Sequence, residues 1–510
     1  MAFRMPVALL ICLVSVTWAK PLQSSADRKK QDSYWDAPVE ERDIFSIIEQ
    51  YTKGISKELH HGDIALHPRH SDVQVWTRST DGTVNIPYTI SSDFTAQDRG
   101  LFSAALQEYT TLTCIRFTNR ENEDNYINII SDAGCYSYLG RIGGAQDLSL
   151  QRNACLIAGI IQHELNHVLG FEHEQCRTDR DNFVQIYWEN IADGYQSNFY
   201  ISDQDTLGLE YDYSSVMHYG KFAFTTNYLK ATIKPIPNEF LAIGQRYGLS
   251  NLDVAKINRL YNCSVCSTLL SEFNGSFVSA NYPSRYSHNA NCVWLLRIPR
   301  EKVLLQFDAF DVQSSPGCAS DYVRVYDGDS RISPVLLDRA CGTWMLPLMI
   351  ASANKMLVEF VTDGSVTASG FKASYTSVTC GGTLTAANGN FSSPGSPYYP
   401  PLTDCIWTIV APAEYKVSLS FTSFSLEMSN RCAYDYLMVR DGGRLTSSLL
   451  GKFCGTGGVP ALVSSGRALL MEFHSDGSQE FEGFLAHYTF SKSRLRLSLL
   501  FHIILMQRNY

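Results

Sequence analysis

The sequence predicts a multidomain chain in which one α+β domain is followed by two all-β sandwich modules. Two observations carry that prediction. The C-terminal half contains an internal repeat with cysteines at matching positions. The region before it combines an apolar run with helical spacing, residues 154–169, and strand-like runs such as "NYINIIS" at 125–131.

Composition places the chain among ordinary globular proteins. It has 510 residues, of which 45% are hydrophobic and 18% charged, with a formal net charge of −9. That length has room for about three domains. No Lys- or Arg-rich run stands out, so we expect no nucleic-acid partner.

Residues 1–19 have the pattern of a secretory signal peptide. Arg4 precedes an apolar core from Pro6 to Val16, and small residues follow at the expected cleavage site. The apolar run is too short to cross a bilayer, although an N-terminal core helix is the alternative. The C-terminal run, 491–510, is interrupted by Arg496 and His502, so we expect a tail rather than a membrane anchor. The sequence therefore predicts a secreted, extracellular protein without a membrane span.

Secretion changes how the 14 cysteines are interpreted, because disulfides form in an oxidising compartment. Cys12 leaves with the signal peptide, and an odd number remains. At least one thiol therefore has no partner within the chain.

The internal repeat defines two modules, 266–377 and 380–490. "CASDYVRVYDG" in the first matches "CAYDYLMVRDG" in the second, and runs such as "VLLQFDAF" and "KVSLSFTSF" predict antiparallel strands in a sandwich. Four cysteines permit three connectivities in each module, and the most economical one pairs them in order. These pairs are Cys266–Cys292, Cys318–Cys341, Cys380–Cys405 and Cys432–Cys454. In cysteine spacing and in the "C-x-x-D-Y" turn, both modules resemble CUB domains.

The stretch "HELNHVLGFEH" predicts a metal site. His163 and His167 are four residues apart on the expected helix, so they share a face. His173 would lie about 9 Å further along the axis if the helix continued, too far for one ion. The chain must therefore turn at Gly170, which adopts a left-handed cap at little cost. Three imidazoles could then hold one Zn²⁺, with the Glu164 carboxylate beside its bound water. The alternative is a helix with solvent-facing histidines.

With "RTDRD", "SVMHYG" and "LYNC", this stretch makes residues 70–263 resemble the astacin family of metzincin proteases. The resemblance implies that His163, His167 and His173 bind zinc and that Glu164 is the general base. It also implies a floor under the metal from Met217 and a displaceable zinc ligand, Tyr219, that stabilises the oxyanion. Glu174 would receive the new N-terminus after activation, and His218 is expected to be structural. The implied disulfides are Cys114–Cys263 and Cys135–Cys155.

Cys176 departs from the family pattern and is the expected odd thiol. It follows the third histidine by three residues. We expect an inert, half-buried thiol; an intermolecular bridge and a role at the metal are the alternatives.

Residues 20–69 look like a removable pro-segment. "LHHGDIAL" is similar to an inhibitory motif of the family, in which an aspartate occupies the open zinc position, and Asp63 fits that role. His60 stands where the family has an aromatic residue, and His61 offers a competing ligand. An activating protease is expected to cut after Arg69.

The second module carries Glu427, Asp435 and Asp476 at positions where some CUB domains bind Ca²⁺. The first has Asp321 and Asp363, but a neutral amide, Gln313, replaces the glutamate. We therefore expect calcium in the second module and not in the first; solvated acidic clusters are the alternative. Asn274 and Asn390 lie in glycosylation sequons.

The domain order resembles that of vertebrate hatching enzymes, in which two CUB modules directly follow the astacin domain. The resemblance implies a protein substrate, most simply an egg-envelope or extracellular-matrix glycoprotein. A matrix or growth-factor-processing protease is the alternative enzyme. A catalytically silent CUB binding protein is the alternative of another class.

Overall fold

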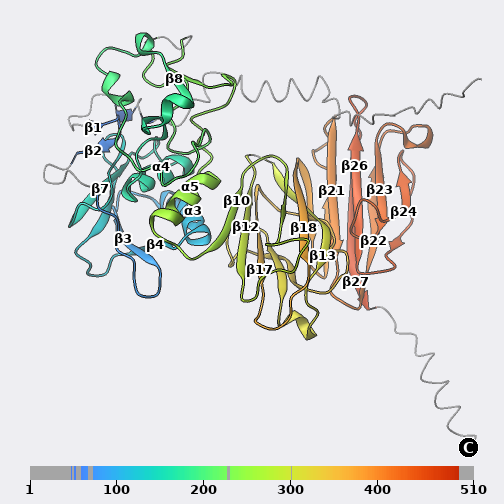
Figure 1. Cartoon of the computed structure of the whole chain (residues 1–510). Coiled ribbons are helices and arrows are strands. Elements are labelled where there is room, and N and C mark those ends of the chain that lie inside the picture. The colour runs from blue at the N-terminus through green and yellow to red at the C-terminus, as the bar shows by residue number, and fades with distance from the viewer. Residues whose placement is uncertain are drawn as a thin grey trace, which may run out of the picture.

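The computed structural model describes residues 48, 51–52, 59–66, 73–226, 230–299 and 301–492. Three bodies follow one another in space: the α+β domain, the first sandwich and the second sandwich (Figure 1). The expected signal peptide, most of the pro-segment and the C-terminal tail lie outside the described residues. None of the described helices is both long and apolar enough to cross a membrane.

A seven-stranded mixed sheet forms the first domain, with strands in the order β1-β2-β6-β7-β5-β3-β4. Strand β2, in the expected pro-segment, pairs in parallel with β6, so residues 64–65 extend the sheet of the domain that follows them. The strands are β1 (Leu59–His60), β2 (Ile64–Ala65), β3 (Val84–Ile90), β4 (Ile115–Asn119), β5 (Tyr126–Ile130), β6 (Cys135–Tyr138) and β7 (Ala145–Leu150).

Helices α3 (Ala96–Leu112), α4 (Ala158–Val168) and α5 (Asn251–Leu260) complete this domain. Capping boxes begin α3 at Thr95 and α5 at Ser250, where each side chain satisfies a free backbone N–H of the first turn. Helix α4 packs between α3 and β6. Shorter elements follow α4: η1 (Glu174–Cys176), η2 (Arg180–Asn182), β8 (Val184–Ile186), η3 (Trp188–Asn190), η4 (Gln196–Phe199) and β9 (Ile233–Pro235).

Each sandwich packs a five-stranded sheet on a four-stranded sheet. The first has the orders β10-β12-β17-β14-β15 and β11-β18-β13-β16. Its elements are β10 (Cys266–Leu270), β11 (Gly275–Val278), β12 (Asn291–Arg297), β13 (Lys302–Asp311), η5 (Pro316–Cys318), β14 (Tyr322–Tyr326), β15 (Val335–Ala340), β16 (Met349–Ile350), β17 (Lys355–Val361) and β18 (Gly370–Val378).

The second sandwich repeats this topology as β19-β21-β26-β23-β24 and β20-β27-β22-β25. Its elements are β19 (Cys380–Leu384), β20 (Asn388–Ser392), β21 (Thr403–Val410), β22 (Tyr415–Ser425), η6 (Asn430–Cys432), β23 (Tyr436–Asp441), β24 (Ser448–Phe453), β25 (Leu462–Val463), β26 (Ala468–Ser475) and β27 (Gly483–Lys492).

The prediction of antiparallel strands is wrong for the first strand of each module. Strand β10 pairs with β12 in parallel, and β19 pairs with β21 in parallel. In both cases a disulfide links the first residue of the N-terminal strand to the cysteine that lies opposite it in the neighbouring strand, Cys266 to Cys292 and Cys380 to Cys405. The other strand pairs of the modules are antiparallel.

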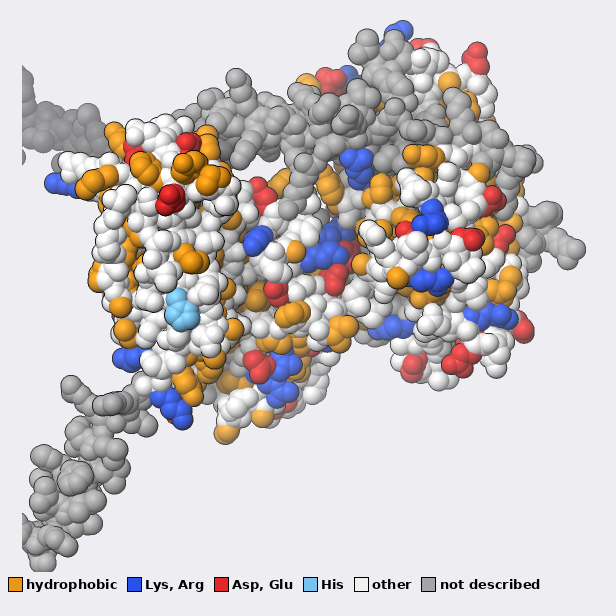
Figure 2. Space-filling model, turned by 180° about the vertical axis from the view of Figure 1, so that it is seen from behind, with side chains coloured by type: hydrophobic (Ala, Val, Ile, Leu, Met, Phe, Trp, Pro, Cys, Tyr) orange, Lys and Arg blue, Asp and Glu red, His pale blue; other side chains and the backbone are white. Residues whose placement is uncertain are grey.

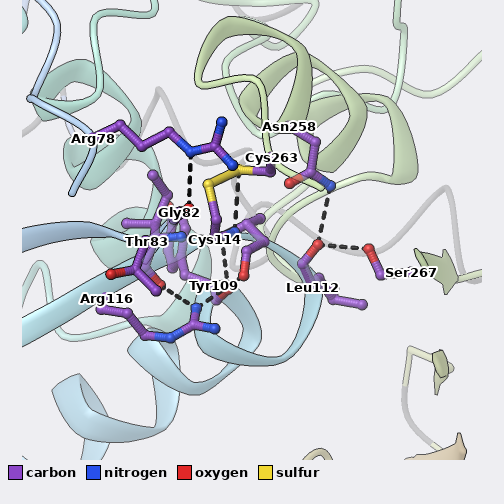
Figure 3. The surroundings of a disulfide bond; sticks show 12 residues. Arg78, Gly82, Thr83, Tyr109, Leu112, Cys114, Arg116, Asn258, Cys263 and Ser267 are labelled. Atoms are coloured by element: carbon purple, nitrogen blue, oxygen red, sulfur yellow. Dashed lines mark hydrogen bonds between the residues drawn. A yellow bond between two sulfur atoms is a disulfide. The ribbon is translucent and has the colours of Figure 1, made fainter. Parts of the chain in front are cut away.

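Six disulfides join the cysteine pairs expected from the sequence. On the face shown in Figure 2, positive and negative side chains are interspersed. The Cys114–Cys263 bridge ties the start of β4 to the segment after α5, beside the C-terminal end of α3 (Figure 3). Both sequon asparagines, Asn274 and Asn390, are exposed.

Among the described cysteines, Cys176 alone forms no disulfide, and it is fully buried. Its Sγ lies 3.7 Å from the Asn198 carbonyl oxygen and 3.6 Å from Nε2 of Gln175. Burial raises the pKa of this thiol. An intermolecular bridge does not fit a sulfur with no exposed surface, so the structure favours the inert thiol.

We expect the folded protein to be unreactive toward a thiol reagent such as DTNB, because a buried neutral thiol is a poor nucleophile. In concentrated guanidinium chloride without reductant, one thiol per chain should react. Cys176→Ser should abolish that signal. Rapid reaction of the folded wild type would contradict the buried position of Cys176.

Candidate metal centre

Helix α4 carries the first two histidines, and its end brings in the third. The helix ends at Val168, and Gly170 has φ +97°, as the sequence predicted for a left-handed turn. The Phe171 N–H donates to the Asn166 carbonyl and closes the turn. The chain then reverses and places His173 against His163 and His167.

The three imidazoles converge through their Nε2 atoms. His163 Nε2 lies 3.2 Å from Nε2 of both His167 and His173, and all three side chains are fully buried. The Nδ1 atoms of His163 and His167 contact the carbonyl oxygens of Val216, at 2.8 Å, and Phe171, at 2.7 Å. A carbonyl can only accept, so these Nδ1 atoms carry the proton and each Nε2 keeps its lone pair free. This donor set fits a zinc ion.

Asp63, in the expected pro-segment, lies against the same three nitrogens. Its carboxylate oxygens are 3.0 Å from His163 Nε2, 3.3 Å from His173 Nε2 and 3.4 Å from His167 Nε2. The Asp63 carbonyl accepts from the Ser137 N–H of β6 at 3.1 Å.

His61, the competing ligand considered from the sequence, has a ligand atom within 4.8 Å of ligand atoms of His173 and Cys176. Its Nδ1 lies 3.8 Å from the Glu172 carboxylate, and its ring stacks on His60. The backbone carbonyl of His61 accepts a hydrogen bond from the Tyr219 hydroxyl at 2.5 Å. Asp63, rather than His61, reaches all three histidines.

Glu164 is fully buried, and neither of its carboxylate oxygens has a hydrogen-bond partner among the described residues. Burial, and then the negative charge of Asp63, raises its pKa well above the usual value. A buried, unpaired carboxyl next to three convergent imidazoles is the arrangement expected of a group that handles protons.

The turn that contains Met217 lies against the three histidines, and Asp253 of α5 holds it in place. Asp253 accepts from the Ser215 hydroxyl at 2.6 Å and from the Val216 N–H at 2.9 Å. The local sequence around Asp253 indicates only a capping box with Ser250 and gives no sign that its carboxylate also holds this turn. Met217 is buried, and the Tyr219 ring lies 4.7 Å from the His173 ring between centroids.

His218 points away from the three histidines. Its Nε2 lies 2.8 Å from the Tyr211 hydroxyl, and its Nδ1 contacts the Tyr219 carbonyl at 2.7 Å. Burial lowers its pKa to about 4. These contacts agree with the structural role expected for it.

Glu174 is buried and held by two cations. One oxygen accepts from Arg177 at 3.2 Å and from the Asp212 N–H at 2.9 Å, and the other contacts the Lys256 ammonium. Its expected contact with a new N-terminus stays a prediction, because residues 67–72 lie outside the described part of the chain. Nothing in the local sequence pointed to Lys256 as its partner.

In the second sandwich, oxygens of Glu427, Asp435 and Asp476 lie within 4.8 Å of one another. Asp435 accepts from the Tyr399 hydroxyl and from the Asp476 N–H. Burial, and then the charges of Asp435 and Asp476, raises the pKa of Glu427. In the first sandwich, the Gln313 amide nitrogen, in the orientation that satisfies its neighbours, donates to Val366 O at 2.8 Å and to Asp321 at 3.3 Å.

Comparison with known proteins agrees with this geometry. The model of the astacin peptidase family matches residues 71–262, and the CUB domain model matches 266–375 and 380–488. Embryonic protein UVS.2 of Xenopus laevis is 44% identical over 515 residues, covering 96% of this chain and 100% of that protein. The astacin-like metalloendopeptidase of Gallus gallus is 46% identical over 370 residues, 71% of this chain and 90% of that protein.

One solved structure with a similar sequence is high choriolytic enzyme 1, a hatching enzyme zinc-protease from Oryzias latipes. It is 49% identical, covers 37% of this chain and 94% of its own, and has a TM-score of 0.37.

Fold and site together define a zinc metalloendopeptidase. The chain belongs to the astacin family and carries two CUB domains after its protease domain. This family membership sets aside the catalytically silent binding protein.

Proposed function

We propose that this protein is secreted as a latent precursor and, after activation, hydrolyses glycoproteins of the egg envelope. The proposal depends mainly on the match to embryonic protein UVS.2. This match covers the whole length of UVS.2 and nearly all of the present chain. The domain order, with two CUB modules directly after the protease domain, supports the same substrate class.

We propose specific roles for the residues of the centre. His163, His167 and His173 would hold one zinc ion. This ion would act as a Lewis acid and make a water molecule bound to it more acidic. Glu164 would accept the proton of the attacking water and pass it to the leaving amine. The Tyr219 hydroxyl, once released from the His61 carbonyl, would donate to the developing oxyanion, and Met217 would support the histidines from below.

The runner-up is a protease that processes matrix proteins or growth factors. Human tolloid-like protein 1 is 38% identical over 413 residues, 79% of this chain but 40% of that protein. The match to tolloid-like protein 1 leaves most of that relative uncovered, whereas the match to embryonic protein UVS.2 covers all of it. We therefore prefer the egg-envelope substrate.

The substrate is tested by incubating the activated protein with isolated egg envelopes and sequencing the fragment ends. Wild type should release envelope fragments, and Glu164→Gln should lower the rate about 10²–10⁴-fold, the usual contribution of a general base. Glu172→Gln serves as a control beside the site. If wild type cleaves a generic protein but leaves the envelope intact, the hatching proposal fails and the processing protease replaces it.

Latency is tested with Asp63→Ala in the full-length precursor. We expect this variant to cleave a short fluorogenic peptide before any proteolysis, whereas the wild-type precursor stays silent until trypsin treatment. His61→Ala is the matched control and should remain latent, because only its backbone carbonyl contacts Tyr219. An Asp63→Ala precursor as silent as wild type would show that the carboxylate does not block the centre.

We propose that Glu427, Asp435 and Asp476 bind Ca²⁺ in the second module. In the first module, the Gln313 amide nitrogen would occupy the position of the cation. Calcium binding is tested by exchanging Glu and Gln between these two positions. Adding CaCl₂ to decalcified protein should raise the melting temperature, and Glu427→Gln should remove that rise. Gln313→Glu should create a second, additive rise. A wild-type melting temperature that does not respond to calcium would contradict the proposal.

A further inference from the structure

A buried cluster of charges joins the first CUB module to the protease domain. Glu108, on α3, is 2% exposed, and one of its oxygens lies 2.6 Å from Arg297 Nη1 of β12. The other oxygen lies 3.2 Å from the Lys355 ammonium of β17, which also contacts Asp329 at 2.8 Å. Arg297 and Lys355 face each other across paired strands. Both cations that neutralise Glu108 therefore come from the CUB module.

The same carboxylate holds the zinc helix. Gln162, the residue before His163 on α4, donates from Nε2 to Glu108 at 3.1 Å and to the Ala105 carbonyl at 3.1 Å. Its Oε1 accepts from the Leu249 N–H at 2.8 Å, while the Leu249 carbonyl accepts from Arg297. Arg297 thus contacts two of the three residues that bond the Gln162 amide, Glu108 through its carboxylate and Leu249 through its carbonyl.

Gly248 leaves the space in which these groups meet. It has φ +128°, and a Cβ at this position would lie 2.3 Å from Arg297 Nη1 and 2.4 Å from Gln162 Oε1. A side chain here would push the CUB arginine away from the zinc helix. The close approach of the two domains therefore depends on glycine at this residue.

Apolar packing continues across the same seam. Five buried residues of the CUB module belong to the hydrophobic core cluster of the protease domain: Leu269, Val293, Leu295, Tyr326 and Leu357. At the C-terminal end of α3, the Leu112 carbonyl accepts from Asn258 of α5 and from Ser267 of β10, at 3.0 and 2.6 Å (Figure 3). The Thr111 hydroxyl donates to the Asp329 carbonyl at 2.8 Å.

Removing one partner of a buried charge costs more than the pair contributes, because the remaining charge stays in a poor solvent. Burial acts to raise the pKa of Glu108, but the charges of Arg297 and Lys355 outweigh it and keep that pKa below its usual value. Without these cations Glu108 would have to take up a proton or move. Either change disturbs its hydrogen bond with Gln162.

We propose that the first CUB module is part of the catalytic unit and that Arg297 is a positioning residue, acting through Glu108 and Leu249 on Gln162 and so on the zinc helix. A module that only captured substrate would need no contact with the residues that hold α4. This role of Arg297 does not depend on the physiological substrate, because it acts on the geometry of the histidines.

The test uses the full-length, activated protein and a short peptide substrate that is too small to reach the CUB surfaces. Arg297→Met should lower kcat about tenfold with little change in KM, and zinc should transfer faster to a chelating dye. Arg297→Lys should recover part of the loss, because lysine can pair with Glu108 without also bonding the Leu249 carbonyl. Arg440→Met, which removes an ion pair with Glu472 in the second CUB module, should match wild type.

Arg297→Met with wild-type kcat and wild-type zinc transfer would overturn the proposal, as would an effect confined to KM for large proteins. If this variant is not secreted, Glu108→Gln/Arg297→Met removes both charges and should restore secretion while kcat stays low. A secreted double variant with wild-type kcat, or failure of both variants to be secreted, would reduce the role of Arg297 to folding alone and overturn the positioning role.

Discussion

Three imidazoles must meet at one point if they are to bind one metal ion, and several other features of the protease domain follow from that requirement. A straight helix supplies two of them, so the chain must reverse within three residues to supply the third, and Gly170 makes that reversal. Convergent lone pairs also require fixed tautomers. Carbonyls of Val216 and Phe171 fix two of them from outside α4. The turn at 215–217 and its anchor, Asp253 on α5, therefore belong to the metal centre although they bind nothing themselves.

Much of this centre could be predicted from local sequence, because its geometry is encoded at short range. The spacing of His163, Gly170 and His173 specifies a helix, a turn and a shared point in space. The module repeat and its cysteines likewise predict two sandwiches. The parallel pairing of β10 with β12 could not be read from alternation, since alternation reports which face is buried and not the direction of the neighbouring strand.

Contacts between segments that lie far apart in the chain could not be predicted from the sequence. Lys256 lies in an unremarkable helical stretch, yet it neutralises Glu174, and Glu108 resembles any helix-surface glutamate until a second domain covers it. Each is a buried charge whose partner is set by tertiary packing. The nearly continuous apolar run "CVWLLR" in β12 was a usable signal, because a sheet buried on both faces loses the alternation of a one-sided sheet.

The apolar seam under α3 also has a consequence for the order of assembly. Ribosomes make α3, α4 and α5 before β10, β12 and β17, so the protease domain is complete in sequence while one of its faces still has no cover. Leu295 and Leu357 reach that face only after more than a hundred further residues beyond the zinc helix have been synthesised. The nascent protease therefore carries an uncovered hydrophobic surface during synthesis, and the first CUB module closes it as an intramolecular chaperone would.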